Sequence, residues 1–129
     1  MPHSLDAIAN RVRMADPNLL HLSLEADLLH TLLLQSEWPP EWHHVTRFNP
    51  LDRLESAISL IERFFPGWDF GVQYRFDDKT DEKYASAVLS TPNGSTVYSE
   101  EVRGGCIAMP KATCLVLLRG LKDQLSHAA

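Results

Sequence analysis

The sequence contains little cysteine. Its two cysteines, Cys106 and Cys114, stand eight positions apart and form no CxxC pair. A disulfide framework or a cysteine-based metal site requires several cysteines at short, regular spacings. We therefore predict two reduced and at least partly buried thiols, in a domain that folds without covalent cross-links.

Basic residues are also few and scattered. The chain has 12 lysines and arginines against 17 acidic residues, which gives a formal net charge of −5. A protein that binds nucleic acid through its phosphates needs lysine and arginine gathered on one surface, so no nucleic-acid partner is expected. The acidic residues between Asp77 and Glu82 are interrupted by Lys79, which is typical of a solvated turn.

The sequence has no long hydrophobic run. The stretch bounded by Leu19 and Leu34 is rich in leucine, but His21, Glu25 and Asp27 interrupt it. A membrane-spanning helix needs about 20 predominantly apolar residues. The N-terminal residues lack the basic and apolar segments of a secretion signal. The sequence therefore predicts no membrane contact and a cytoplasmic location.

The composition indicates one compact domain. The 129 residues are 44% hydrophobic and 22% charged, as in ordinary globular proteins. Within this domain we predict an N-terminal helical segment over residues 1–45 and an α/β sandwich core over residues 46–129.

Three helices are predicted before the first strand, from apolar residues at helical spacing. The first is short and covers residues 5–12. Asp16-Pro17 and Asn49-Pro50 each combine a capping residue with a first-turn proline. We therefore expect the second helix to run from about residue 16 to residue 35, and the third from about residue 50 to residue 65.

Leucines cover more than one face of the second predicted helix. One stripe consists of Leu19, Leu22, Leu29 and Leu33, and the other of Leu20, Leu24, Leu28 and Leu32. A single packing face needs only one stripe. We therefore predict a homo-oligomer formed through the helix between Leu19 and Leu34.

Alternation with a period of two begins after Pro66-Gly67. Five apolar residues alternate with polar residues or glycine, namely Trp68, Phe70, Val72, Tyr74 and Phe76. This pattern predicts a strand with one buried face. Further strands are expected over residues 84–90 and 96–102, on either side of an Asn93-Gly94 turn.

A fourth helix is predicted from about residue 109 to residue 125, beginning at Pro110. Its expected buried stripe consists of Cys114, Leu117, Leu118, Leu121 and Leu125. The predicted fold class is therefore α+β, with a three-stranded antiparallel β-meander packed with helices. The element order is α-α-α-β-β-β-α, in sandwich-like layers.

Three segments of the chain suggest a family. Residues 47–51 lead into an aliphatic helix, residues 65–68 (Phe-Pro-Gly-Trp) end it before a strand, and a closing helix starts near residues 109–112. Together they resemble the phage ABA sandwich domain, a family of small proteins encoded by phages and prophages. The resemblance implies helices on two sides of a sheet. It implies no catalytic residues and no assigned biochemical activity.

Histidine side chains are candidate metal ligands. His21 and Glu25 are four residues apart on a predicted helix and could share one face, but His30 lies well round the helix and no third ligand accompanies the pair. His43 and His44 are adjacent in a loop, where neighbouring side chains usually point apart. We predict no metal and no cofactor.

The candidate ligand-binding residues lie before the last helix. Arg103, Gly104 and Gly105 resemble a backbone turn that could hold an anion, and Trp42 and Phe48 could supply aromatic surface to a ligand or partner. More simply, the glycines permit unusual backbone angles, and the aromatic residues cover the end of the helical layer.

Cys106 is the one plausible nucleophile, because a thiol near a helix N-terminus has a lowered pKa. Nucleophilic catalysis also needs an oriented base beside the thiol, and no motif indicates one. We predict no catalytic residues.

Three functional hypotheses follow. The first is a non-enzymatic phage or prophage accessory protein that acts by binding a host or phage protein, or by self-association. The second is a binder of a small nucleotide-like signal that uses the glycine turn. The third is an enzyme whose site is assembled from residues far apart in the sequence.

Overall fold

The computed structural model of the chain describes residues 5–16, 18–19, 21–33 and 49–128. Four α-helices, three strands and a short 3₁₀ helix lie within these residues. In chain order they are α1 (Leu5–Met14), α2 (Leu22–Leu33), α3 (Leu54–Phe64), β1 (Asp69–Asp77), β2 (Glu82–Ser90), β3 (Val97–Arg103), the 3₁₀ helix η2 (Gly105–Ala108) and α4 (Met109–Ala128).

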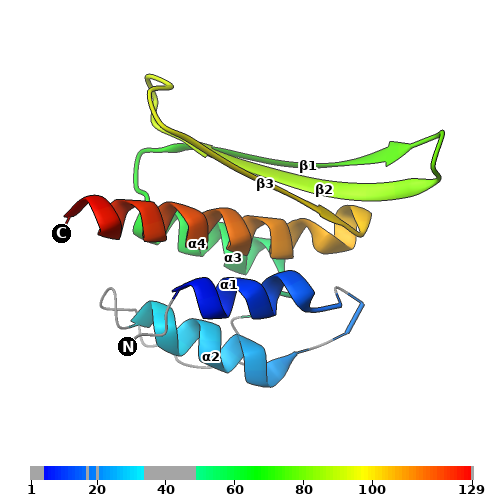
Figure 1. Cartoon of the computed structure of the whole chain (residues 1–129), viewed down its shortest axis with the longest axis horizontal. Coiled ribbons are helices and arrows are strands. Elements are labelled where there is room, and N and C mark those ends of the chain that lie inside the picture. Colours follow the sequence, from blue (N-terminus) through cyan, green and yellow to red (C-terminus); the bar gives the residue numbers. More distant parts are fainter. Residues whose placement is uncertain (1–4, 17, 20, 34–48, 129) are drawn as a thin grey trace.

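The elements form layers (Figure 1). The sheet is the first layer, α3 and α4 lie next to it, and α1 and α2 form the outermost layer. The predicted α+β fold class and element order are confirmed. The described helices all lie on one side of the sheet. This differs from the two-sided arrangement that the resemblance to the phage ABA sandwich domain implies.

The three strands form an antiparallel meander in the order β1-β2-β3. Ala85 and Ala87 of β2 are fully buried, and α4 packs against this strand. Phe70 and Val72 of β1 are partly buried against the core, as the alternation predicts. The burial does not continue along the strand, because Tyr74 and Phe76 are 61% and 50% exposed.

The helix α4 lies at the centre of the core. It contacts all three strands as well as α1 and α3. Its residues from Ala112 to Leu118 are at most 1% exposed, so this part of α4 is buried around its circumference rather than along one stripe, whereas Arg119 and Lys122 farther along are exposed. Among the described helices, α4 included, none is long and apolar enough to cross a membrane.

Two predicted helix starts are wrong. The Asp16 carboxylate accepts hydrogen bonds from Asn18 instead of capping a helix, and α2 begins only at Leu22. The Asn49 carbonyl accepts the backbone N–H groups of Asp52 and Arg53 in a turn, so α3 begins at Leu54. In both places a turn lies between the capping-type residue and the helix. The predicted end of the second helix lies outside the described residues.

Gly120 allows a close contact between α4 and its neighbours. A Cβ atom at this position would lie 2.8 Å from Cζ of Phe65 and 3.4 Å from Cδ2 of Leu89. The Phe65 ring is buried and packs edge-on against Trp68, with 4.9 Å between the ring centroids. The ring therefore has little room to move, and glycine is required for α4 to lie this close to the Phe65 ring.

We predict that Gly120→Ala destabilises the fold. Overpacking costs about 1–3 kcal/mol and outweighs the ~1 kcal/mol that alanine gains in helix propensity. Chemical denaturation should therefore show a lower free energy of unfolding than in the wild type. Gly71→Ala is the matched control, because its Cβ would meet nothing within 4 Å. A gain in stability for Gly120→Ala would contradict the predicted clash.

Candidate functional site

At the predicted anion site, which lies at the end of β3, polar groups already interact with other residues of the chain. Gly104 and Gly105 adopt positive φ angles of 129° and 70°. The Gly104 N–H donates a hydrogen bond to the Lys83 carbonyl at 2.9 Å, and the Arg103 guanidinium lies 3.5 Å from the Glu82 carboxylate. An anion would have to compete with both partners. The nucleotide-binding hypothesis stays a prediction that this geometry does not favour.

Several predicted site residues lie outside the described residues. They are Trp42 and Phe48 of the proposed ligand surface and the adjacent histidines His43 and His44. Cys106 is described and is exposed, so the expectation that both thiols are buried is correct only for Cys114.

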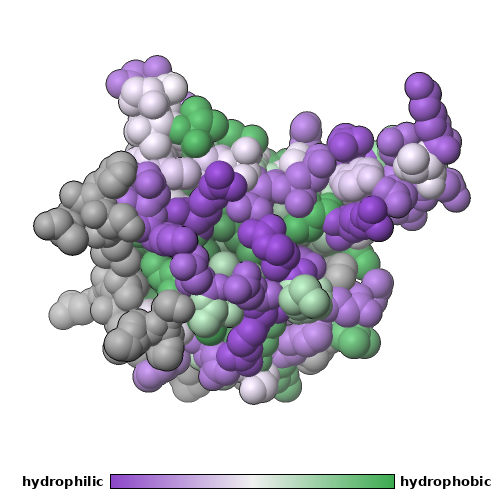
Figure 2. Space-filling model, in the orientation of Figure 1, coloured by the Kyte–Doolittle hydropathy of each residue, from purple (hydrophilic) through white to green (hydrophobic). Residues whose placement is uncertain are grey.

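The β1–β2 hairpin extends beyond the helical layers (Figure 1). Tyr74 and Phe76 are 61% and 50% exposed, and Ile107 of the neighbouring η2 is 47% exposed. We call Tyr74, Phe76 and Ile107 the overhang. Hydrophilic side chains cover the tip of the hairpin, which projects at the upper right of Figure 2. The overhang is therefore an apolar surface next to a polar margin.

A second apolar feature lies at the opposite end of β1. It is a hollow of about 500 Å³ between α3 and the start of the strand, lined mainly by Ile58, Phe65, Trp68 and Phe70. We call it the β1 hollow. Trp68 is partly buried there and stacks on Tyr98, with 6.1 Å between the ring centroids.

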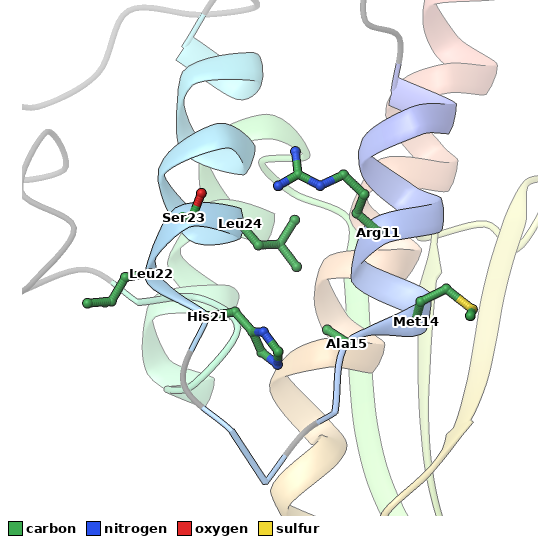
Figure 3. A pocket seen from close by; sticks show the side chains of 7 residues that line it. All are labelled: Arg11, Met14, Ala15, His21, Leu22, Ser23 and Leu24. Atoms are coloured by element: carbon green, nitrogen blue, oxygen red, sulfur yellow. The ribbon is translucent and has the colours of Figure 1, made fainter.

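His21 and Glu25, considered as a metal pair, lie in different environments. His21 lines an open hollow of about 490 Å³ between α1 and α2, and its ring points into that space (Figure 3). Its Nε2 atom is 3.0 Å from the Asp16 carbonyl oxygen. Glu25 is fully buried. In the part of the chain that the structure describes, no three His, Cys, Asp or Glu side chains are grouped to hold a metal.

Glu25 belongs to a buried polar cluster between α2, α4 and the turn before α3. Its Oε1 atom accepts the Leu51 N–H at 2.6 Å, and the Cys114 thiol donates to the Pro50 carbonyl at 3.3 Å. Burial raises the pKa of Glu25 to about 7; the hydrogen bond from Leu51 opposes this rise and the charge of Asp52 adds to it. Burial also raises the pKa of the Cys114 thiol, and the nearby Glu25 contributes to that rise.

The sequence analysis missed this cluster because it weighed Glu25 only as a polar interruption of the leucine-rich stretch and as a metal ligand beside His21. The available signal was its position on the apolar face of α2, next to Leu24 and one turn before Leu28 and Leu29, all of which are buried. The contact with Leu51 joins residues 26 positions apart. No local pattern could predict that partner.

We predict that Glu25 makes the protein less stable as the pH rises. Between its ordinary pKa of 4.5 and the folded value of about 7, the folded chain keeps a proton on Glu25 that the unfolded chain has released. The free energy of unfolding should therefore fall across this window, by about 3 kcal/mol in total. Glu25→Gln keeps an acceptor for Leu51 without the charge and should remove most of this fall.

Urea denaturation between about pH 4.5 and pH 8 tests this prediction. Glu62→Gln, on the exposed side of α3, is the matched control and should follow the wild-type curve. The same pH slope in Glu25→Gln and in the wild type would show that Glu25 does not titrate with the raised pKa.

Comparisons of the chain with protein-family models, with curated proteins and with solved structures found no match. The resemblance to the phage ABA sandwich domain therefore stays a prediction.

Proposed function

We propose that the protein acts by binding another protein molecule through the overhang, without chemistry of its own. In this proposal it is an accessory protein of a phage or prophage and works in the host cytosol. The sequence-based resemblance supports the phage origin, and the exposed side chains of β1 and η2 support the binding surface.

The exposure of Tyr74 and Phe76 carries the proposal. Both residues continue the sheet face on which Trp68, Phe70 and Val72 pack against the core. Aromatic side chains give large, rigid contact areas and are enriched at the centres of protein interfaces, whereas the rims are polar. The overhang and the hydrophilic hairpin tip have this composition.

The helix α2 offers a smaller surface than its leucine content suggested. Four of its leucines are already buried inside the chain, namely Leu24, Leu28, Leu29 and Leu32. Leu19 and Leu22 are exposed, at 61% and 47%. Self-association through this helix stays a proposal, with Leu19 and Leu22 as its contact residues.

Photo-crosslinking in host cells tests the proposed function. We expect p-benzoylphenylalanine in place of Phe76 to form covalent adducts with a partner, which mass spectrometry would identify. The same residue in place of Val97 is the control, because Val97 is 56% exposed but belongs to β3. Position 97 should give no adducts. Equal labelling at both positions, or none at either, would contradict binding through the overhang.

A further inference from the structure

The outer edge of β1 can accept another strand. β1 has nine residues, and within the described residues β2 is its one neighbour in the sheet. An edge strand presents backbone N–H and C=O groups that can pair with a strand of another chain. The side chains along this edge indicate what kind of strand could pair with it.

The backbone groups that face this edge belong to the even-numbered residues of β1. The Gly104 N–H donates to the Lys83 carbonyl, so the backbone N–H and C=O groups of Lys83 point toward β3. In an antiparallel sheet, the backbone groups of successive residues point to the two neighbouring strands in turn. The backbone groups of Ser86 therefore point toward β1, where Gln73 is its partner. The odd-numbered residues of β1 therefore bond to β2. The groups left for a new strand are those of Phe70, Val72, Tyr74 and Phe76.

The two ends of β1 are complementary to each other. The end that begins at Trp68 borders the β1 hollow, and the end that includes Tyr74 and Phe76 belongs to the overhang. A second β1 strand that runs antiparallel places its overhang against the first copy's hollow. The reverse contact forms at the same time, because the arrangement has a two-fold axis.

Charge selects one register for this pairing. With Val72 opposite Val72 of the second copy, Asp69 stands opposite Arg75 of the second copy, twice by symmetry. Arg75 is half exposed and lies 3.2 Å from Glu101, so its guanidinium retains donors for another carboxylate. Moving the centre to Gln73 would place Asp69 opposite Asp77 of the second copy, where like charges repel.

The same register also matches apolar side chains on the inner face. Phe70 stands opposite Tyr74 of the second copy, and Trp68 stands opposite Phe76 of the second copy. Aromatic pairs across neighbouring strands stabilise a sheet. Val72, at the two-fold axis, is in a hydrogen-bonded pair, as its outward backbone groups require.

From these observations we propose that a second copy of this chain pairs with the outer edge of β1, antiparallel and with Val72 opposite Val72. The two sheets then form one sheet of six strands, and each copy's Tyr74 and Phe76 lie against the partner's β1 hollow. This inference rests on the proposed function, because it names the partner of the overhang.

Sedimentation velocity over a concentration series tests the dimer. The wild type should sediment as a dimer at about 100 μM, and Phe76→Ser should raise the dissociation constant at least tenfold. Val97→Ser is the matched control, since it removes an exposed apolar side chain from β3, and should leave the constant unchanged. A dimer weakened by Val97→Ser but not by Phe76→Ser would overturn the proposal.

Disulfide cross-linking tests the register. Positions 71 and 73 of two copies form a non-hydrogen-bonded pair in the proposed register, with Cα atoms about 4.5 Å apart, which suits a disulfide. A Cβ at Gly71 meets nothing within 4 Å. In a Cys106→Ser background, mixed Gly71→Cys and Gln73→Cys chains should cross-link to each other. Cross-linking of either variant alone, without the mixed product, would indicate a neighbouring register and overturn this one.

The proposed function and the dimer can fail separately. A wild-type protein that stays monomeric at about 1 mM overturns the dimer. If photo-crosslinking at position 76 then captures a different protein, the overhang is still a binding surface and the proposed function stands. Absence of any adduct at position 76 overturns the proposed function as well.

Discussion

The fold depends on the burial of α4 between the sheet and the other helices. A helix buried around its circumference needs apolar residues on every side, and the run from Ala112 to Leu118 supplies them with a single polar interruption at Thr113, which hydrogen-bonds back to Met109. Close packing also needs a small residue on one side of a contact, as Gly120 of α4 is against Phe65 and Leu89. Ala85 and Ala87 of β2 satisfy this requirement on the sheet side.

Two buried carboxylates connect the layers at the margins of this core. Glu25 holds α2 to the turn before α3 through Leu51. Glu100 of β3, whose side chain is 8% exposed, receives Arg13 of α1 at 2.9 Å and Arg119 of α4 at 3.3 Å. Glu100 has two cations to offset its desolvation, whereas Glu25 is fully buried with a raised pKa. Paired cations therefore offset the desolvation of the Glu100 carboxylate, whereas burial at Glu25 favours the protonated acid.

The sequence predicted the features that depend on local periodicity and missed those that depend on distant contacts. Alternation after Gly67 and the helical spacing of α4 gave the correct elements and order. The starts of α2 and α3 were misplaced because Asp16 and Asn49 form turns instead of caps. The buried position of Glu25 and the exposure of Phe76 depend on where other elements end, which no short window of sequence contains.

The β1–β2 hairpin continues past the end of β3. The last pair between β2 and β3 is Tyr84 with Arg103, whereas β1 and β2 stay paired as far as Asp77 with Glu82. Gly104 and Gly105 turn the chain out of the sheet at this point, with φ angles that other residues rarely adopt. The chain then forms η2 and returns beneath the sheet as α4. The glycines of the predicted anion site therefore end β3 before the β1–β2 hairpin ends, so Phe76, which pairs with Lys83, lies beyond the last pair between β2 and β3.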